Sequence, residues 1–554
     1  MKRQVGVVGL GTMGAGIAEV FARAGLDVIG VEADPAALER GRGHLEASTG
    51  KAVSRGKLTE EAREEILGRV TFTTDLRDLA GAGLVVEAIP EVMDLKRRLF
   101  EDLDRLCGPE TILATNTSSL SVTAIAATTA RPEKVVGLHF FNPAPIMRLV
   151  EVIRTVTTAP ETVEAVTALA RDLGKTVVSV GDRAGFVVNR LLLGYLNHAA
   201  VLLDSGLAGR DDIDAAMKLG AGLPMGPFTL LDLIGLDTSY EVVEVLFRES
   251  RDRRHAPAPL LREMVSAGLL GRKSGRGFYD YSASGTAEPE APVSEVTRVG
   301  VVGSGAQART LVAELARAGY DVAFAARGRT EIDEALAALG LDDEAAKRVT
   351  GVTEIAELAG AGILIEAVTD ERTLERAVFS SLDEIAGPDT VLATTAASTP
   401  VIELTAGLTH PGQVVGLHLV GDGVAEIAST VVTSPEAARA VHALAERMGR
   451  RAAHCRDRAG FVVNALLYPY LNDAVRMYES GYASMEDIDA AMRLGCGYPA
   501  GPFETLDAIG LAAVRDGLRA LYAEYREPAY APAPLLDQLV TAGVTSIRAF
   551  GRTA

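Results

Sequence analysis

The chain has 554 residues, which is too long for one hydrophobic core. Of these residues 48% are hydrophobic and 23% are charged, a composition typical of globular proteins. The formal net charge of −19 argues against a nucleic acid or an anionic membrane as the main partner. No apolar run reaches the roughly 18 residues of a membrane span, so a membrane partner is not expected.

Residues 1–4, Met-Lys-Arg-Gln, lead straight into a short apolar strand pattern, and no secretory signal core is expected there. The three cysteines, Cys107, Cys455 and Cys496, are odd in number and far apart. They form neither a disulfide framework nor a metal-ligand spacing. These features favour a cytoplasmic location and predict no metal site.

Short apolar runs alternate with helical patterns through the first third of the chain. The runs are 4–9, 27–32, 84–89, 111–115 and 135–140. This βα alternation predicts a mostly parallel sheet covered by helices. After Gly185 the pattern becomes helical throughout, which predicts a separate all-α domain.

A glycine-rich loop follows the first strand and opens a helix. Its predicted cofactor-binding residues are Gly9, Gly11, Thr12, Met13 and Gly14. The glycines allow a tight turn, a close approach to a pyrophosphate and close helix packing. Glu32, at the end of the next strand, suits the ribose hydroxyls, and no arginine follows it, so NAD is favoured over NADP. The alternative is a structural glycine turn in another kind of α/β protein.

Long segments of the chain occur twice. The segment 5–25 recurs at 299–319, and 182–189 recurs at 457–464. The offset falls from 294 at the glycine loop (303 − 9) to 279 at the histidine of VVGLH (418 − 139) and 275 at the asparagine of FVVN (464 − 189). The second copy has therefore lost 15 residues early and four residues just after its histidine. This period far exceeds the roughly 20–50 residues of a solenoid repeat, so a whole two-domain protein is duplicated.

The predicted fold class is an α/β Rossmann-like domain plus an all-α C-terminal domain, the pair repeated twice. We call residues 1–283 copy one and residues 298–554 copy two. The predicted boundaries are 1–183 for the first Rossmann-like domain, 184–283 for the first helical domain, 284–297 for a polar linker, 298–458 for a degenerate Rossmann-like domain, and 459–554 for the second helical domain.

Copy one contains several ordered motifs, at 116–119 (NTSS), 137–143 (GLHFFNP), 150–152 (VEV) and 185–190 (GFVVNR). Together these motifs resemble the L-3-hydroxyacyl-CoA dehydrogenase family. The resemblance covers nearly all of 1–283. It implies NAD as cofactor, an acyl-CoA substrate and a helical domain that dimerises. The reaction would be reversible oxidation of an (S)-3-hydroxyacyl-CoA to a 3-oxoacyl-CoA.

The residues themselves suit this chemistry. Oxidation of a secondary alcohol needs a base, and a neutral histidine such as His139 serves near pH 7. A carboxylate such as Glu151 fixes the histidine tautomer and stabilises the imidazolium. Taken singly, His139 could be structural and Glu151 a surface residue; the ordered set favours function. By resemblance, His139 is the base, Glu151 its partner, Ser118 and Asn189 bind substrate, and Glu91, Lys96 and Asn116 surround the cofactor.

Ser48, Lys51 and Arg55 lie where the family's coenzyme A site falls. Their i, i+3, i+7 spacing puts them on one face of a helix, where two cations could hold CoA phosphates. An ordinary solvated helix face explains the same spacing equally well. Gly50 within this segment weakens the helix prediction.

Copy two has lost many of these residues. The replacements are Gly14 by Ala308, Glu32 by Ala326, Lys96 by Glu375, Asn116 by Thr395 and Ser118 by Ala397. His418, Glu426 and Asn464 persist and argue the other way, but a retained histidine can serve packing or hydrogen bonding, and the shortened loop after His418 puts its old geometry in doubt. We therefore expect the active site in copy one only. The helical part of copy two is better kept, which predicts that the two helical domains pair within one chain, with further homo-oligomers left open.

The leading interpretation is a short-chain enzyme of the 3-hydroxybutyryl-CoA type acting in fatty-acid metabolism by β-oxidation chemistry. A dehydrogenase for a dicarboxylic or aromatic-degradation hydroxyacyl-CoA is the runner-up. A non-catalytic NAD- or acyl-CoA-binding protein is the alternative outside enzymes. The residues do not reveal the acyl preference, the physiological direction or the pathway.

Overall fold

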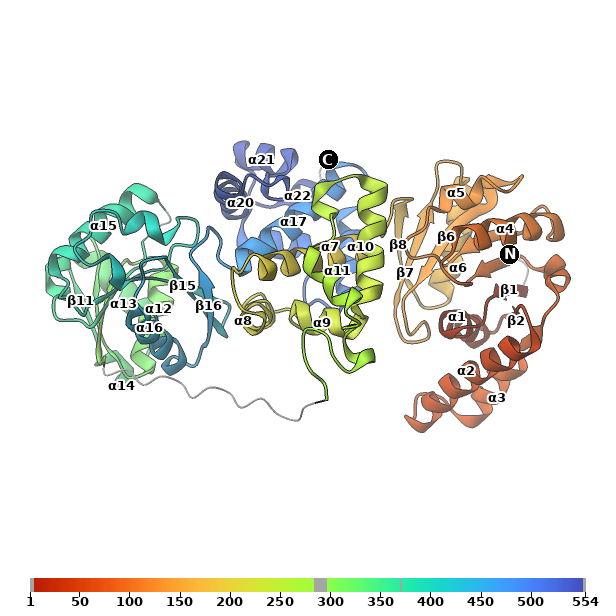
Figure 1. Cartoon of the computed structure of the whole chain (residues 1–554), viewed down its shortest axis with the longest axis horizontal. Coiled ribbons are helices and arrows are strands. Elements are labelled where there is room, and N and C mark those ends of the chain that lie inside the picture. Colours follow the sequence, from red (N-terminus) through yellow and green to blue (C-terminus); the bar gives the residue numbers. More distant parts are fainter. Residues whose placement is uncertain (1–3, 283–295, 369–370, 552–554) are drawn as a thin grey trace.

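The computed structural model describes residues 4–282, 296–368 and 371–551. Two α/β domains lie at the ends of the molecule, and a block of helices lies between them (Figure 1). The predicted linker 284–297 falls outside the described residues except for its last two positions.

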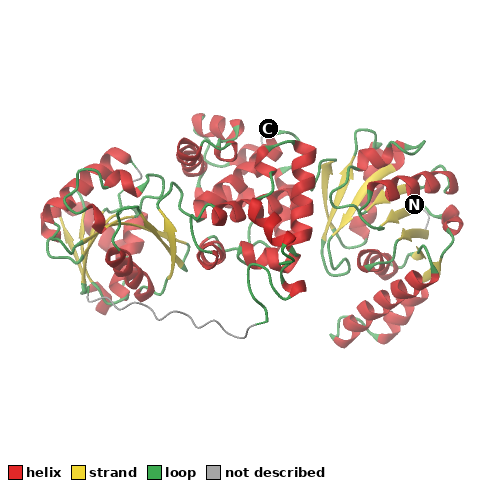
Figure 2. Ribbon diagram, viewed as in Figure 1, coloured by secondary structure: helices red, strands yellow, loops and turns green. Residues whose placement is uncertain are grey.

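The first α/β domain is built on an eight-stranded sheet with the order β3-β2-β1-β4-β5-β6-β7-β8 (Figure 2). All neighbouring strands are parallel except the antiparallel pair β6 and β7. Its strands are β1 (Gln4–Val8), β2 (Asp27–Val31), β3 (Val70–Thr73), β4 (Leu84–Glu87), β5 (Ile112–Thr115), β6 (Val135–Phe140), β7 (Leu149–Arg154) and β8 (Thr176–Gly181). The chain reverses direction across the sheet between β1 and β4, where ligands bind in folds of this kind.

Helices cover both faces of this sheet, which explains why its central strands are apolar on both sides. The helices are α1 (Thr12–Arg23), α2 (Pro35–Ser54), α3 (Glu60–Gly68), α4 (Met93–Leu106), α5 (Val122–Ala126) and α6 (Pro160–Asp172). Phe21 of α1 and Val166 of α6 pack in the core of one face. Leu103 of α4 and Ile125 of α5 pack in the core of the other.

The second α/β domain repeats the same strand order, β11-β10-β9-β12-β13-β14-β15-β16. Its strands are β9 (Arg298–Val302), β10 (Asp321–Ala325), β11 (Val349–Val352), β12 (Ile363–Glu366), β13 (Val391–Thr394), β14 (Val414–Val420), β15 (Val424–Ser429) and β16 (Arg451–Arg456). Its helices are α12 (Ala306–Arg317), α13 (Arg329–Ala338), α14 (Asp343–Ala346), α15 (Arg372–Ile385) and α16 (Pro435–Arg447). The helices α2 and α3 have 20 and 9 residues, and their counterparts α13 and α14 have 10 and 4. The early deletion therefore shortened this helix pair and left the sheet intact.

The two helical domains pack against each other in the middle of the molecule (Figure 1). The first contains α7 (Val188–Asp204), α8 (Arg210–Ala215), α9 (Pro227–Ile234), α10 (Leu236–Ser250) and α11 (Pro259–Ser266). The second contains α17 (Val463–Glu479), α18 (Met485–Cys496), α19 (Pro502–Ile509), α20 (Leu511–Tyr525), α21 (Pro534–Thr541) and α22 (Ile547–Gly551). No helix in the described ranges is both long and apolar enough to cross a membrane.

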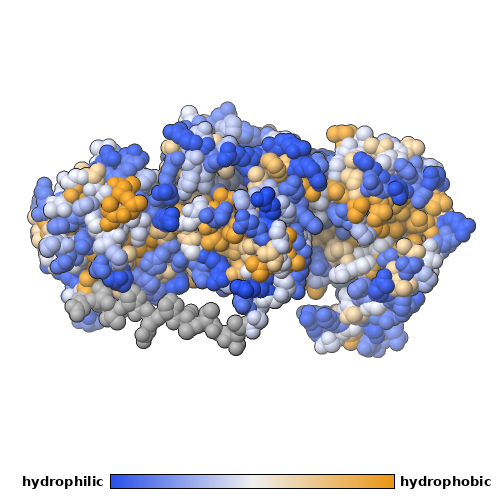
Figure 3. All heavy atoms as spheres, viewed as in Figure 1, coloured by the Kyte–Doolittle hydropathy of each residue, from blue (hydrophilic) through white to orange (hydrophobic). Residues whose placement is uncertain are grey.

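The two helical domains pair within one chain, as the sequence predicts, and helices α7 and α17 lie in contact between them. The rings of Tyr195 and Tyr470 meet edge to face, with centroids 6.3 Å apart. His198 Nε2 lies 2.9 Å from the Tyr530 hydroxyl, and Arg254 pairs with Asp473. Apolar side chains also gather on the outer surface of this central block (Figure 3).

Each helical domain also packs on the sheet of the other copy. Helix α18 of copy two contacts β8 of copy one, and α8 of copy one contacts β16 of copy two. The backbone N–H of Arg456 donates to the carbonyl of Leu207 at 2.7 Å. Strands β8 and β16 are the edge strands of their sheets, so this crosswise packing covers backbone groups that would otherwise be open to pairing with other chains.

Candidate active site

The centre of the site in copy one is a histidine–carboxylate pair on two neighbouring strands. His139 in β6 stands opposite Glu151 in β7 in the antiparallel register. His139 Nδ1 lies 2.7 Å from Glu151 Oε2, and both side chains are buried. The other carboxylate oxygen of Glu151 accepts hydrogen bonds from the backbone N–H groups of Val187 (3.1 Å) and Val188 (3.2 Å).

This arrangement fixes the tautomer of the histidine. A carboxylate is only an acceptor, so the neutral imidazole carries its proton on Nδ1 and leaves a lone pair on Nε2. The start of α7 holds Glu151 in place through the two backbone donors. The strands and α7 together therefore produce an oriented base, and Asn189 follows Val188 in the first turn of α7.

The loop after β5 runs beside this pair. The backbone N–H of Phe140 donates to Asn116 Oδ1 at 2.8 Å, so Asn116 ties the loop to the end of β6. Ser118 is half-buried, and its backbone N–H donates to Glu91 Oε1 at 2.9 Å. Its hydroxyl lies 3.4 Å from the same oxygen, a weak contact that leaves it available to another partner.

Lys96 is buried between two carboxylates. Its ammonium lies 2.5 Å from Glu87 Oε1 and 3.2 Å from Glu91 Oε2. Burial raises the pKa of Glu91, but Lys96 and the hydrogen bonds from Thr117 and Ser118 outweigh it, so the net pKa lies below the usual value. The Lys96 side chain is 1% exposed. It therefore acts on the site by holding Glu91, and through it the loop that carries Ser118.

The glycine loop fits a dinucleotide. Gly9 has a φ of +87°, and its backbone N–H donates to the carbonyl of Val31 at 2.9 Å. A Cβ on Gly14 would lie 1.7 Å from the Gly9 carbonyl oxygen, so no side chain fits there. A Cβ on Gly11 would meet nothing within 4 Å, which leaves open space before the N-terminus of α1 for a pyrophosphate. Thr12 and Met13 occupy the first turn of that helix.

Glu32 lies immediately after β2, next to this loop. Its Oε1 accepts a hydrogen bond from the backbone N–H of Leu10 at 2.6 Å. This contact holds the carboxylate at the mouth of the loop, where an adenosine ribose of a bound dinucleotide would lie. The residues present thus suit NAD.

Ser48 and Lys51 lie on α2, and Arg55 is its C-terminal cap. Ser48 is half-buried, whereas Lys51 and Arg55 are exposed. The helix predicted for this segment is present despite Gly50. Neither cation has an ion pair within the part of the chain that the structure describes, and their role in coenzyme A binding stays a prediction.

Copy two keeps the histidine–carboxylate geometry, contrary to the expectation from its shortened loop. His418 Nδ1 lies 2.7 Å from Glu426 Oε2, and Glu426 Oε1 accepts from Val462 (2.9 Å) and Val463 (2.8 Å). The four missing residues come from the connection between β14 and β15, now only residues 421–423. The loop is outside the paired strands, so its loss leaves the register of His418 with Glu426 unchanged.

Sequence reasoning missed two features of the site. One is Glu87, which ends strand β4 and accepts hydrogen bonds from Thr115 (2.6 Å), the backbone N–H of Ile89 (2.8 Å) and Lys96. The sequence signal that could have indicated it is a carboxylate at the end of an apolar run. Helix α18 of copy two contacts β7, which carries Glu151. A Cβ on Gly495 would lie 3.1 Å from Leu149 and 2.9 Å from Val188, so copy two packs directly behind the pair.

A dinucleotide-type sheet, a glycine loop at its reversal point and an oriented histidine base define a nicotinamide-dependent dehydrogenase. The family model "3-hydroxyacyl-CoA dehydrogenase, NAD binding domain" matches residues 4–183 and 298–458. The model "3-hydroxyacyl-CoA dehydrogenase, C-terminal domain" matches residues 185–281 and 460–550. The chain belongs to the 3-hydroxyacyl-CoA dehydrogenase family, and its cofactor is NAD.

Similar proteins fall into two sizes. A probable 3-hydroxybutyryl-CoA dehydrogenase of Deinococcus radiodurans is 51% identical over 276 residues, which are 50% of this chain and 99% of that protein. A 3-hydroxyadipyl-CoA dehydrogenase of Escherichia coli K12 is 35% identical over 535 residues, 96% of each chain. The crystal structure of a 3-hydroxybutyryl-CoA dehydrogenase from E. coli K12 matches with a TM-score of 0.76 and 33% identity, covering 98% of this chain and 99% of that one.

Proposed function

We propose that copy one oxidises the 3-hydroxyl of an (S)-3-hydroxyacyl-CoA with NAD, and that copy two does not catalyse this reaction. The observation that carries the proposal is the His139–Glu151 pair at 2.7 Å beside the Ser118 loop. Copy two has a comparable pair, but Thr395 and Ala397 stand where copy one has Asn116 and Ser118.

In this mechanism His139 Nε2 accepts the proton of the substrate hydroxyl. Glu151, held by two backbone donors, stabilises the imidazolium that forms and keeps the ring oriented. Bound NAD would accept the hydride that leaves the carbon bearing the 3-hydroxyl. Ser118 and Asn189 bind the substrate oxygens as neutral partners that do not compete as bases. Reduction of a 3-oxoacyl-CoA uses the same groups in reverse.

The half-length relative favours a short acyl chain such as 3-hydroxybutyryl-CoA. The tandem relative, which shares the whole architecture, is named for 3-hydroxyadipyl-CoA, and this favours a dicarboxylic acyl chain as the second candidate. A comparison of kcat/KM for the two substrates on the full chain decides between them. A ratio near one would leave neither preferred.

The reaction itself is tested by following the absorbance of NADH after the protein is mixed with NADH and acetoacetyl-CoA. We expect oxidation of NADH that depends on the CoA thioester, and calorimetry should give one tightly bound NAD per chain. Two equivalent NAD sites, or no turnover with any 3-oxoacyl-CoA, would contradict the proposal.

A further inference from the structure

A cavity of about 1270 Å³ lies in copy two, in the place of its cofactor site. It extends from the loop 303–307 past Arg327 to His418 and Asn464. Small-molecule pockets commonly enclose about 300–1,000 Å³, so this cavity is large enough for a dinucleotide. The deletions in copy two have therefore not closed the site.

The loop at one end of the cavity keeps a dinucleotide pattern, Gly-Ser-Gly-Ala-Gln-Ala at 303–308, because the last position accepts alanine as well as glycine. Gly303 has a φ of +138°, against +87° for Gly9. Ala308, which stands where copy one has Gly14, is fully buried beside this altered turn. A Cβ on Gly305 would meet nothing within 4 Å, which leaves open space before α12 for a pyrophosphate.

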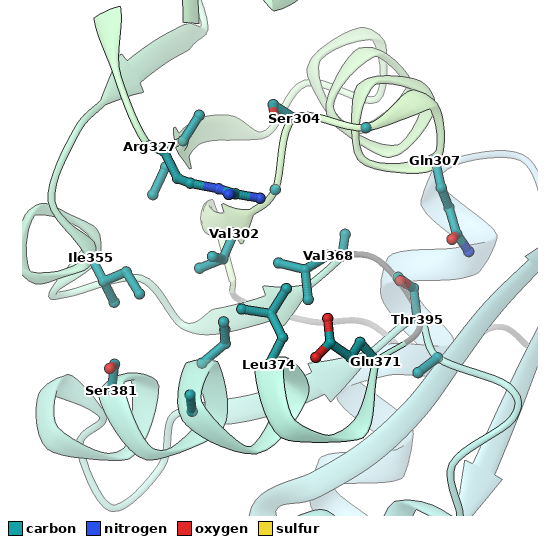
Figure 4. Close-up of a pocket in the computed structure, with 18 of the residues that line it drawn as sticks. Val302, Ser304, Gln307, Arg327, Ile355, Val368, Glu371, Leu374, Ser381 and Thr395 are labelled. Atoms are coloured by element: carbon teal, nitrogen blue, oxygen red, sulfur yellow. The ribbon is translucent and has the colours of Figure 1, made fainter. Parts of the chain in front are cut away.

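The ribose end of the cavity has changed its charge. Ala326 replaces the carboxylate of Glu32, and Arg327 follows it and lines the cavity. Figure 4 shows the Arg327 side chain pointing into the cavity between Ser304 and Val302. Its backbone N–H donates to Glu331, but its guanidinium has no ion pair or hydrogen bond among the described residues. Arg329, two residues on, is directed to Asp333 at 3.3 Å instead.

We propose that copy two binds an adenine dinucleotide whose adenosine ribose carries a 2′-phosphate, the NADP(H) class, with Arg327 as the ligand of that phosphate. A carboxylate at this position selects the free 2′-hydroxyl, whereas a nearby arginine accommodates the 2′-phosphate. Glu331, Glu354, Glu371 and Glu384 also line the cavity. They oppose anions in general, so the site accepts only a ligand that places its phosphates at Arg327 and at the start of α12.

Calorimetric titration of NADPH into the full chain, first saturated with NADH, tests the proposal. We expect one further site per chain, absent for inorganic phosphate. Arg327→Ala should weaken NADPH binding at this site by at least tenfold, and the matched control Arg329→Ala should leave it unchanged. Turnover with NAD in copy one should be unaffected in both variants, and circular dichroism should confirm that both are folded.

Two nucleotide fragments identify the phosphate position. We expect 2′,5′-ADP to compete with NADPH for the site. We expect 3′,5′-ADP, the fragment that coenzyme A carries, to bind more weakly than 2′,5′-ADP. Ala326→Glu, which restores the copy-one carboxylate, should convert the site from NADPH to NADH. The proposal is overturned if the NADH-saturated chain binds no NADPH, if Arg327→Ala binds it normally, or if 3′,5′-ADP is the tighter fragment. Because these readouts measure binding, they are independent of whether copy one turns over a hydroxyacyl-CoA.

Discussion

His139 and His418 make equivalent contacts with a glutamate on the neighbouring strand, each at 2.7 Å. Their surroundings differ, since the serine and asparagine of the copy-one loop are alanine and threonine in copy two. A histidine base contributes to turnover only where substrate can be bound beside it. The two residues therefore form a matched pair for testing which copy catalyses.

We expect His139→Ala to lower kcat by about 10²–10⁴, the usual contribution of a general base, with little change in NAD affinity. Glu151→Gln should also lower kcat because it releases the histidine. Steady-state kinetics and NAD titration measure both effects. The control, His418→Ala, should leave kcat nearly unchanged; a halved activity in that variant, or normal turnover without His139, would show that the catalytic copy is misassigned.

Glu32 leads to a prediction about cofactor choice in copy one. Its carboxylate is held at the loop by Leu10 and would repel a 2′-phosphate, so turnover should prefer NAD to NADP. Comparison of kcat/KM for the two cofactors measures this preference. Glu32→Ala should reduce the preference. A wild-type protein with a higher kcat/KM for NADP than for NAD would contradict the assignment of Glu32 as the residue that selects NAD.

Between the two helical domains, histidines are held neutral by burial. Burial lowers the pKa of His198 to about 4, although Asp473 opposes the shift. Burial also lowers the pKa of His255 to about 4, with a smaller effect of Arg190 in the same direction. Both values lie below the ordinary value of about 6.5. The folded state therefore loses no stability to protonation of these two histidines above pH 6.5. Below that pH the free energy of unfolding decreases, because the unfolded chain binds protons that the buried histidines do not, and the decrease is complete near pH 4.

We expect the free energy of unfolding to fall between pH 6.5 and 4, by at most about 3 kcal/mol for each shifted histidine. Urea denaturation across this range measures the slope. His198→Gln keeps a polar partner for Tyr530 without titrating, so it should flatten the profile. The exposed His44 provides the control, because His44→Gln should not alter the profile; identical slopes for all three proteins would refute the assignment.

At the scale of elements, much of the architecture could be predicted from sequence. The apolar runs predicted a mostly parallel sheet, and the changes in offset indicated where copy two is shorter. The geometry of His418 could not be predicted, because a count of missing residues does not tell whether they come from a strand or from the turn between strands. In this case the deletion shortened only the turn at residues 421–423, and the strand register was preserved.

The cavity of copy two was also beyond sequence reasoning. Each replacement, taken alone, indicated loss of the original ligand contact. Whether the space stays open depends on the packing of α12, α13 and α15 around it. Lys96 shows the same limit. The family resemblance implied a position near the cofactor, whereas the burial of Lys96 between Glu87 and Glu91 became visible only in three dimensions.

At the scale of the whole molecule, the pairing of α7 with α17 predicts how copy one behaves alone. Residues 1–283 would expose the face of α7 that packs on α17, including Tyr195, which is buried in the intact chain and contacts Tyr470. We expect this fragment to form dimers or to aggregate, because apolar surface of this kind is stable only when covered. Light scattering after size exclusion measures its mass, with the full chain as reference. A stable, fully active monomer would contradict the structural role of copy two.

The crosswise packing of α18 on β7 and β8 has a consequence for the order in which the protein is made. The surroundings of Glu151 are complete only once α18 has been synthesised, and α18 ends at Cys496, 308 residues after α7 begins (496 − 188). At about 5–20 residues per second on the ribosome, that interval is roughly 15–60 s. During it the nascent first copy exposes a sheet edge and an apolar helix face. A chaperone that binds such surfaces therefore has its longest opportunity before translation reaches the second helical domain.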